Sequence, residues 1–323
     1  MQRRDLGRLA LGTLLGLSVR PASAQTFPDK PIRLLVGYPP GGQADSVARL
    51  LARELGPAIG GSVIVENRQG AKALIAADAA AKAPADGYTL LLADRGVLAA
   101  APAFETELRF DPERDLLPLA RAALVPYMLV THAGLGVTNV PQLISHARAN
   151  PGKLSFAYAG ELTQIAIELL RETAKIDLLP VPYKSAGQAA LDVAAGRVDL
   201  LFSDTLVIAP MVQAGTIRVI ATTGAKRSPL YPDVPTLVES GFPDLVWFVW
   251  HSVAAPAGVP KDVAARLLEG LKAALASSAY RSGLARLGFE SIDESPAQFA
   301  AALQADRRRF SELARRLGRT APR

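Results

Sequence analysis

Short apolar runs alternate with amphipathic stretches along most of the chain. The first run, at 32–36, ends in a glycine-rich turn, after which Val47, Leu50, Leu51 and Leu55 recur with the spacing of one helical face. This pattern predicts a strand, a glycine loop and a helix. The same alternation predicts further strands at 63–65, 88–93, 127–130, 154–158, 178–181, 198–202, 217–221 and 245–253. It predicts helices at 74–83, 143–149, 164–174, 188–195 and 206–213, with two or three more ending at 297–317.

Strands that alternate with helices indicate sheets that are mostly parallel and covered by helices on both faces. The alternation occurs in two successive sets, so we expect an α/β fold of two lobes with a ligand cleft between them. The expected first lobe comprises 25–125 and 246–323, and the second comprises 126–245. Ligands of open α/β sheets bind at the carboxyl ends of the strands. This architecture suits a binding protein and a cleft enzyme equally.

Residues 1–24 have the features of an export signal. An arginine pair precedes a short apolar stretch at 11–19, and the small residues Ala22-Ser23-Ala24 follow. The apolar stretch is far shorter than the ~20 residues that span a bilayer. We therefore expect a signal peptide that is cleaved before Gln25, and an exported protein. The general secretory route and the twin-arginine route both stay open.

Composition excludes several classes of chemistry. The 323 residues include no cysteine, which excludes disulfides, thiolate metal sites, iron–sulfur clusters and thiol catalysis. The formal net charge of +6 arises at the two ends of the chain and leaves a slightly acidic body. With 6% aromatic residues there is little surface on which nucleic-acid bases could stack. We therefore expect no nucleic-acid partner and no metal.

No catalytic motif is present. The sequence lacks a G-x-S-x-G elbow, a Walker phosphate loop, a G-x-G-x-x-G run and an H-E-x-x-H pair. His146 falls on a predicted helix and is expected at the surface, while His132 and His251 end predicted strands and are expected to be satisfied structural residues. We therefore expect no enzyme activity and no cofactor. A cleft hydrolase or isomerase is the rival hypothesis, and it lacks a visible nucleophile or base pair.

Two loops between a strand and a helix suit an anion. The first contains Pro39-Pro40-Gly41-Gly42, whose glycines let the backbone approach a ligand closely. The second, at 158–163, stands at the matching position of the second lobe. The helix after each loop starts with unpaired N–H groups and a partial positive charge, so two facing starts would hold a carboxylate between the lobes. A purely structural tight turn explains the first loop equally well.

Short motifs follow one another in a characteristic order over the whole chain after the signal. They are PDKPIR at 28–33, YPPGG at 38–42, VENR at 65–68, PADGYTL at 84–90, VPYK at 181–184, GRVDL at 196–200, AKRSP at 225–229, PDVPT at 232–236 and APAGVP at 255–260. In this order they closely resemble the Bug-type substrate-binding proteins of tripartite tricarboxylate transporters.

The resemblance implies a periplasmic-binding-protein-like fold and a periplasmic, monomeric protein that closes on a small organic anion. Its partner would be the membrane permease of a tripartite transporter. Backbone N–H groups of the two loops would hold the ligand carboxylate, and an aromatic residue before the PPGG turn would line the cleft. The expected ligand-binding residues are Tyr38, Pro40, Gly41, Gly42, Asp45, Arg95, Ala159, Gly160, Glu161, Thr163, Tyr183, Ser203 and Asp204.

The chain departs from the family pattern at positions that bear on the ligand. Lys72 stands in a turn that usually has glycine, and Glu161 replaces a flexible residue of the second loop. Ser203 occupies a position that is commonly acidic and is followed by Asp204. Arg95 stands where small polar residues are usual. The resemblance therefore leaves the identity of the ligand open.

These departures suggest two hypotheses about the ligand. If Arg95 and Glu161 enter the cleft, Arg95 would hold a carboxylate and Glu161 would accept an ammonium or a hydroxyl, which favours an amino acid or a hydroxy acid. In the alternative, both side chains point into solvent and contribute only about 0 to 1 kcal/mol. Glu161 and Asp204 also leave open a divergent binding protein that serves a sensor or takes a cationic or zwitterionic ligand.

Overall fold

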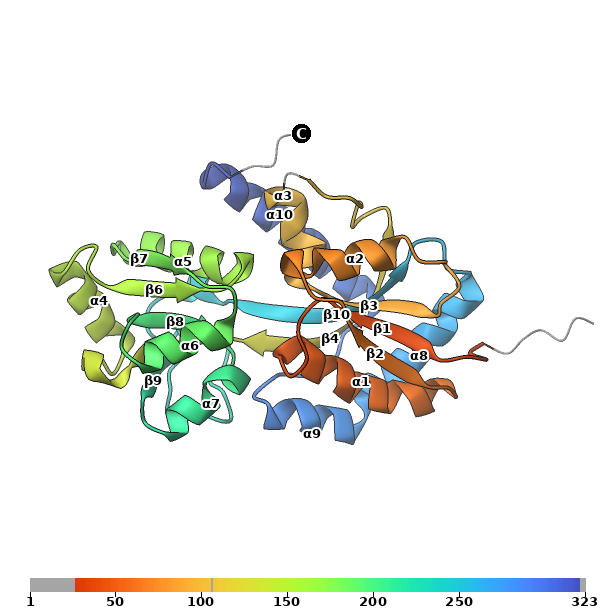
Figure 1. Ribbon diagram of the computed structural model, residues 1–323, viewed down its shortest axis with the longest axis horizontal. Coiled ribbons are helices and arrows are strands. Elements are labelled where there is room, and N and C mark those ends of the chain that lie inside the picture. The colour runs from red at the N-terminus through yellow and green to blue at the C-terminus, as the bar shows by residue number, and fades with distance from the viewer. Residues whose placement is uncertain (1–26, 106, 320–323) are drawn as a thin grey trace, which may run out of the picture.

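The computed structural model describes residues 27–105 and 107–319, which form two lobes, each built around one five-stranded sheet (Figure 1). The predicted signal peptide lies outside the described residues. No helix among the described residues is long and apolar enough to cross a membrane.

The first lobe contains the sheet with strand order β2-β1-β3-β10-β4. Its strands are β1 (Ile32–Val36), β2 (Val63–Asn67), β3 (Thr89–Asp94), β4 (Leu116–Pro126) and β10 (Phe248–Pro256). Strand β1 pairs with β2 and β3 in parallel, whereas β10 pairs with β3 and β4 antiparallel. The helices of this lobe are α1 (Gln43–Ile59), α2 (Leu74–Ala81), α3 (Ala101–Phe104), α8 (Lys261–Ala276), α9 (Ser278–Arg286) and α10 (Pro296–Arg316), with the short turns η1 (Ala71–Ala73) and η2 (Gly96–Ala100).

The second lobe repeats this plan with strand order β7-β6-β8-β5-β9. Its strands are β5 (Met128–His132), β6 (Ser155–Tyr158), β7 (Leu179–Pro182), β8 (Leu200–Ser203) and β9 (Ile217–Thr222). Strand β6 pairs with β7 and β8 in parallel, and β5 pairs with β8 and β9 antiparallel. The helices are α4 (Val140–Ala149), α5 (Glu161–Ala174), α6 (Ala186–Ala194) and α7 (Thr205–Gln213), with the turns η3 (Ala133–Leu135) and η4 (Pro243–Leu245). The predicted two-lobed α/β fold is confirmed, but the sheets are mixed and not mostly parallel, because in each one the strand that enters from the other lobe pairs antiparallel with both of its neighbours.

The apolar pattern of the sequence places each element in the core as expected. All six residues of β3 are buried, as in a strand covered on both faces. Helix α1 buries Val47, Leu51 and Leu55, which lie on one face, against the sheet. Every strand predicted from the sequence is present with slightly shifted ends, because propensity and pattern determine the middle of an element better than its boundary.

The pattern did not predict β4, and the structure shows why. Strand β4 pairs with β10 over its whole length, but the register shifts between His251 and Ser252 and again between Val253 and Ala254. These irregularities interrupt the alternation of apolar and polar residues on which strand prediction depends.

Two segments of chain cross side by side between the lobes. One runs from β4 through Tyr127 into β5, and the other runs through Trp247 into β10. Thr223 holds them together, because its N–H donates to the Tyr127 carbonyl (2.8 Å) and its carbonyl accepts from the Trp247 N–H (2.9 Å). After the second crossing, β10 and the helices α8, α9 and α10 pack on the first sheet, and the end of α10 extends over toward α5 (Figure 1).

Candidate functional site

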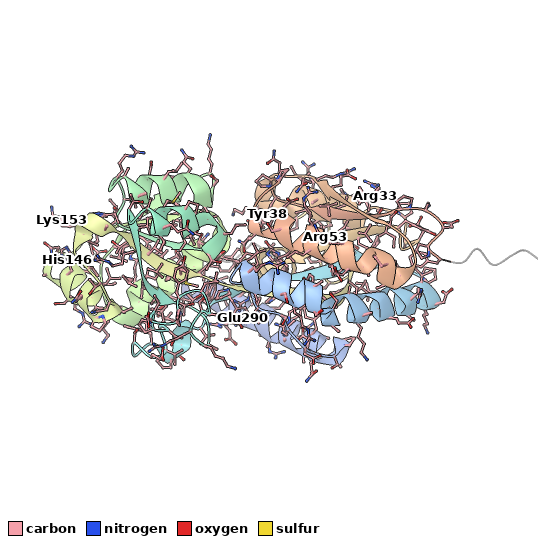
Figure 2. The ribbon with its side chains drawn as sticks, turned by 90° about the horizontal axis from the view of Figure 1, so that it is seen from below. Arg33, Tyr38, Arg53, His146, Lys153 and Glu290 are labelled. Atoms are coloured by element: carbon pink, nitrogen blue, oxygen red, sulfur yellow. The ribbon has the colours of Figure 1, made fainter. Side chains whose placement is uncertain are left out.

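A cavity of about 730 Å³ lies between the lobes and is lined by residues of both. This volume falls within the range of small-molecule sites, about 300–1,000 Å³. The first lobe contributes the loop from β1 to α1, the η1 turn, the end of β3 and the middle of β10. The second lobe contributes the ends of β6 and β8 and the starts of α5, α6 and α7. Figure 2 shows Tyr38 at the junction of the two lobes.

Two helices open onto the cavity without a side-chain cap. Gly42 precedes α1 and Gly160 precedes α5, and neither helix start receives a side-chain hydrogen bond. Gly160 has φ +100°, a conformation that residues with a side chain rarely adopt. Both helix starts therefore present backbone N–H groups and the positive end of the helix dipole to the cavity, one from each lobe.

Asp45 supports the first of these helix starts from behind. Its carboxylate accepts hydrogen bonds from the Gly41 N–H (2.9 Å), Arg49 Nε (2.8 Å) and Asn67 Nδ2 (2.9 Å). Burial opposes the charge, but these donors lower the pKa of Asp45 below its ordinary value. Asp45 does not line the cavity, so it orders the loop and leaves the cavity face to the backbone.

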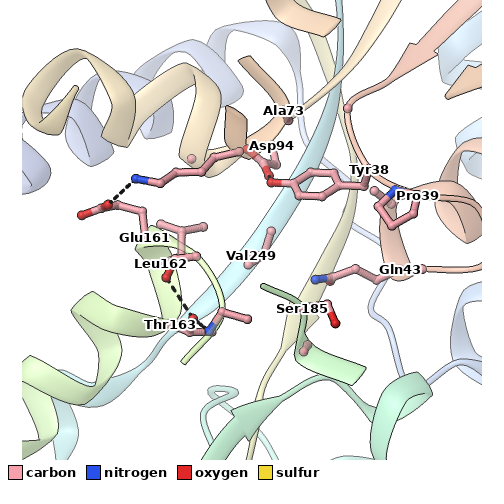
Figure 3. Close-up of a pocket in the computed structure, with 18 of the residues that line it drawn as sticks. Tyr38, Pro39, Gln43, Ala73, Asp94, Glu161, Leu162, Thr163, Ser185 and Val249 are labelled. Carbon is pink, nitrogen blue, oxygen red and sulfur yellow. Dashed lines mark hydrogen bonds and ion pairs between the residues drawn. The ribbon is translucent and has the colours of Figure 1, made fainter. Parts of the chain in front are cut away.

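Acidic and phenolic groups form the inner part of the cavity. The Tyr38 hydroxyl donates to Asp94, and Asp94 Oδ1 also accepts from the Val97 N–H (2.8 Å) (Figure 3). Burial raises the pKa of Asp94 and, together with the charge of Asp94, that of Tyr38. Asp204 directly follows β8 and caps α7 by accepting from the Val207 N–H (3.2 Å), and burial raises its pKa to about 6.

His251 lies in the wall beside these acids. Its side chain is 1% exposed, and neither ring nitrogen has a hydrogen-bond partner among the described residues. Burial lowers its pKa to about 4, so the ring is neutral near pH 7. The expectation of a satisfied structural histidine is therefore wrong for His251, because its ring faces the cavity. His132 does have a partner, with its Nε2 3.3 Å from Asp199 Oδ1.

Ion pairs join the lobes at one edge of the cavity. Lys72 Nζ lies 3.0 Å from Glu161 Oε2 across the lobes, the ion pair drawn at Glu161 in Figure 3. It also lies 2.8 Å from Glu105 Oε1 within the first lobe. Arg319 Nη2 lies 2.8 Å from the other oxygen of Glu161. Burial opposes the charge of Lys72, but hydrogen bonds to the two carboxylates raise its pKa. Glu161 therefore faces the cavity with its charge already balanced by two cations.

Most of the residues proposed from the sequence come together in this cavity, and some do not. Those that line it are Tyr38, Gly42, Ala159, Gly160, Glu161, Thr163, Tyr183, Ser203 and Asp204. Pro40, Gly41 and Asp45 belong to the adjoining loop and helix but are not part of the lining. Within the described residues, no group of three or more His, Asp or Glu side chains could hold a metal ion.

The prediction that Arg95 enters the cleft is wrong. Arg95 is 2% exposed, and its Nε lies 3.0 Å from Asp306 Oδ2 on α10. Its Nη1 donates to the Phe248 carbonyl (3.1 Å), and the guanidinium stacks over the Trp247 ring at 4.9 Å. The side chain therefore points away from the cavity and anchors α10 to the second crossing segment.

Sequence reasoning missed several cavity residues. They include Gln43, Asp94, Tyr127, Ser185 and His251. A partial signal was present for some of them, because Asp94 directly follows a predicted strand and Gln43 and Ser185 precede predicted helices. No local signal identifies Tyr127 or His251, whose place at the cavity depends on pairing between distant segments.

Two α/β lobes, two crossing segments and a cavity lined by both lobes define a solute-binding protein. The family model for the tripartite tricarboxylate transporter family receptor matches residues 47–318, and the chain belongs to this family. The family is one of periplasmic binding proteins and not of enzymes.

Relatives match over nearly the whole chain. A UPF0065 protein from the tcbD-tcbE intergenic region of Pseudomonas sp. (strain P51) is 35% identical, covering 97% of this chain and 93% of the relative. Protein BugT of Bordetella pertussis is 34% identical, covering 92% of each chain.

Solved structures agree with these relatives. The R. palustris protein Rpa4515 with adipate is 32% identical with a TM-score of 0.84, covering 92% of this chain and 100% of that one. The periplasmic binding protein BugD is 29% identical with a TM-score of 0.81 and the same coverage. MatC from Rhodopseudomonas palustris with bound malate is 28% identical with a TM-score of 0.78, covering 89% and 99%.

Proposed function

We propose that this protein captures a small organic carboxylate between its lobes and delivers it to the membrane permease of a tripartite transporter. The observation that carries the proposal is the pair of uncapped helix starts, α1 and α5, which open onto one cavity from opposite lobes. A carboxylate between them accepts hydrogen bonds from both lobes at once, and these contacts hold the lobes around it.

The comparisons support this class of ligand. Similar proteins were solved with adipate and with malate, both of which are carboxylates. The contacting residues in our proposal are Tyr38, Gly42, Ala159, Gly160, Thr163, Tyr183, Ser203 and Asp204. The name of the matching family supports the permease partner, and our proposal takes the protein to be a monomer.

The proposal includes export and a division of the chain. Residues 1–24 would be removed as a signal peptide, leaving a periplasmic chain that begins at Gln25. The lobes would comprise 25–125 with 246–323, and 126–245. Mass spectrometry of the periplasmic fraction tests export, and recovery of only uncleaved chain from the cytoplasm would contradict it.

A variant of Gly42 tests the anion site. Gly42→Asp places a capping carboxylate at the start of α1, where it competes for the free N–H groups and repels an anion. The residue has φ −80°, so a side chain is compatible with its backbone. Isothermal titration calorimetry should show affinity for succinate or malate at least about tenfold weaker, with the folded state as stable as before.

Gly42→Ala is the matched control, because its new methyl group meets only the Pro39 carbonyl at 3.6 Å and leaves the N–H groups free. Its affinity should stay close to that of the unchanged protein. Equal affinities in the aspartate and alanine variants would show that the start of α1 does not hold the carboxylate.

A further inference from the structure

The innermost part of the cavity contains polar groups that lack partners within the protein. We call Asp94, Ser203, Asp204 and His251 the inner wall. His251 and Ser203 are each 1% exposed, and among the described residues neither the His251 ring nitrogens nor Ser203 Oγ forms a hydrogen bond. Leaving a buried polar group unpaired is unfavourable, so a bound molecule that forms hydrogen bonds with these atoms binds more tightly.

The inner wall combines residues of both lobes. His251 stands opposite Asp94 in the antiparallel pairing of β10 with β3, so both side chains leave the same face of the first sheet. Ser203 and Asp204 follow each other at the end of β8 in the second lobe. Tyr127, in the first crossing segment, lines the same cavity. Burial and the charges of Asp204 and Asp94 raise its pKa.

The charges around the inner wall disfavour a second ligand carboxylate there. The ammonium groups that line the cavity belong to Lys72, which is held by Glu105 and Glu161, and to Lys184, which is exposed. No cationic side chain among the described lining residues reaches Asp94 or Asp204. A carboxylate in this position would approach two acids, whereas a hydrogen-bond donor would find acceptors.

We propose that the inner wall recognises a hydrogen-bond-donating substituent, a hydroxyl or an ammonium, on the carboxylate ligand. His251 accepts this hydrogen bond at its bare ring nitrogen, and Ser203 and the acids complete the shell around the substituent. The ligand carboxylate lies at the starts of α1 and α5. This assignment rests on the proposed function and restricts it to hydroxy acids and amino acids.

Matched ligands test the assignment. Affinities of the unchanged protein are measured by calorimetry for succinate, malate and aspartate, and for butyrate, 3-hydroxybutyrate and 3-aminobutyrate. Within each series only the substituent differs, so the ratio of affinities reports its recognition. We expect a hydroxyl or ammonium acid to bind at least about tenfold more tightly than its unsubstituted parent.

The variants His251→Phe and Ser203→Ala should each reduce this ratio toward one. His146→Phe is the control, because Figure 2 places His146 at the far end of the second lobe. The sequence has 3 histidines, so the imidazole signals in an NMR spectrum are few enough to assign by these substitutions. Binding of malate or 3-hydroxybutyrate should shift the His251 signals and leave those of His146 in place.

The outcomes separate the two proposals. If some of these acids bind but the substituted and unsubstituted members agree within about twofold, the inner-wall assignment is wrong and the proposed function stands. The inner-wall assignment is also wrong if an acid binds tightly while the NMR signals of the His251 ring do not shift. If none of the six acids changes the thermal midpoint of the protein, carboxylate capture itself is contradicted, and the inner-wall assignment fails with it.

Discussion

Arg95 lies behind the cavity wall although Asp94 and Gly96, its neighbours in sequence, both line the cavity. Successive side chains at the end of a strand or in a helical turn point in different directions. A residue next to a cavity-lining residue in the sequence can therefore point into the core. The ion pair with Asp306 compensates the buried guanidinium, which would otherwise be an unpaired charge in the core.

Arg95→Met should therefore destabilise the fold, by about 3 kcal/mol, because it leaves Asp306 partly buried without its cation. Urea unfolding measures this loss. Carboxylate affinity of the folded variant should be unchanged. Arg171→Met is the control, since its guanidinium pairs with the exposed Asp177 at 3.0 Å and should contribute about 1 kcal/mol or less. A stable Arg95→Met protein that has lost carboxylate binding would restore Arg95 to the ligand site.

Asp204 makes stability depend on pH with a known sign. Its pKa is about 6 in the folded protein against an ordinary value of 3.8, so the folded state binds more protons than the unfolded state between these values. The protonated Asp204 carboxyl therefore contributes its full stabilisation of the folded state below about pH 4, and this contribution is lost as the pH rises through 6. The cost at neutral pH is about 2 to 3 kcal/mol.

Asp204→Asn should remove this cost and keep the helix cap, because asparagine caps as well as aspartate. At pH 7.5 to 8 thermal or urea unfolding should show a more stable variant, and the difference should shrink as the pH falls to about 4. Asp192→Asn provides a control of opposite sign, since Arg197 and Tyr183 lower the pKa of Asp192 and its charge is favourable in the fold. A pH-independent difference for Asp204→Asn would show that the carboxyl is not protonated more easily in the folded state.

At the scale of elements, the η1 turn is held in an unusual conformation next to the cavity. Ala71, Lys72 and Ala73 have φ values of +45°, +54° and +72°, although each carries a side chain. Such residues cost about 1 kcal/mol or more apiece. Gly37 at the end of β1 makes room for this turn, because a Cβ there would lie 2.2 Å from Ala73 Cβ.

Gly37→Ala should therefore destabilise the protein by about 2 kcal/mol or more, since the turn must move away from the loop between β1 and α1. The displaced turn should also weaken carboxylate binding, as measured by calorimetry. Gly187→Ala on α6 is the control for stability, because nothing lies within 4 Å of its new methyl group. If both variants unfold at the same urea concentration, the close packing of Gly37 on η1 contributes nothing.

Some helices and strands could be predicted from the sequence and others could not. Local periodicity located β1 and the helix starts near Gly42, because an apolar run and a glycine turn are properties of a few adjacent residues. Helix α5 begins at Glu161, earlier than expected, because the backbone conformation of Gly160 allows the helix to start directly after β6. Strand β4 was not predicted, because its residue pattern depends on irregular pairing with β10, which lies more than a hundred residues away in the sequence.

Long-range pairing also limits what can be predicted of the site. The two glycine loops were identified because each presents its N–H groups through local geometry. His251 reaches the cavity only because β10 returns from the second lobe to pair with β3. The partners of Glu161 were equally hidden, since Lys72 and Arg319 are brought to it by the closeness of the lobes.

At the scale of the whole molecule, ionic contacts connect the lobes on one side of the cavity. Helix α5 of the second lobe carries Glu161, Glu168 and Glu172, which face cations of the first lobe. Arg319 lies 2.8 Å from Glu161 and 3.7 Å from Glu168, and Arg316 lies 2.8 Å from Glu172. Together with the pair of Lys72 and Glu161, these contacts form an ionic clasp that stabilises the arrangement in which the lobes touch.

If the ionic clasp holds the lobes together, then added salt or the neutralisation of a clasp residue should let the lobes separate. Exposed pairs contribute up to about 1 kcal/mol each, but Glu161 is only 10% exposed and joins two cations, so its loss should matter most. In Glu161→Gln, solution scattering without ligand should give a larger radius of gyration than in the unchanged protein. Affinity for a bound carboxylate should fall about three- to tenfold, because a smaller fraction of molecules has the lobes in contact.

Raising the salt concentration toward 1 M should expand the unchanged protein in the same way and should affect Glu161→Gln less, since the interaction that salt screens is already gone. Asp177→Asn is the matched control: its carboxylate pairs with Arg171 inside the second lobe at 3.0 Å, so it removes one negative charge without touching the clasp. That variant should keep the radius of gyration and the carboxylate affinity of the unchanged protein. If Glu161→Gln behaves like Asp177→Asn in both measurements, the ion pairs between the lobes do not control their separation, and the helix ends alone must hold them around the ligand.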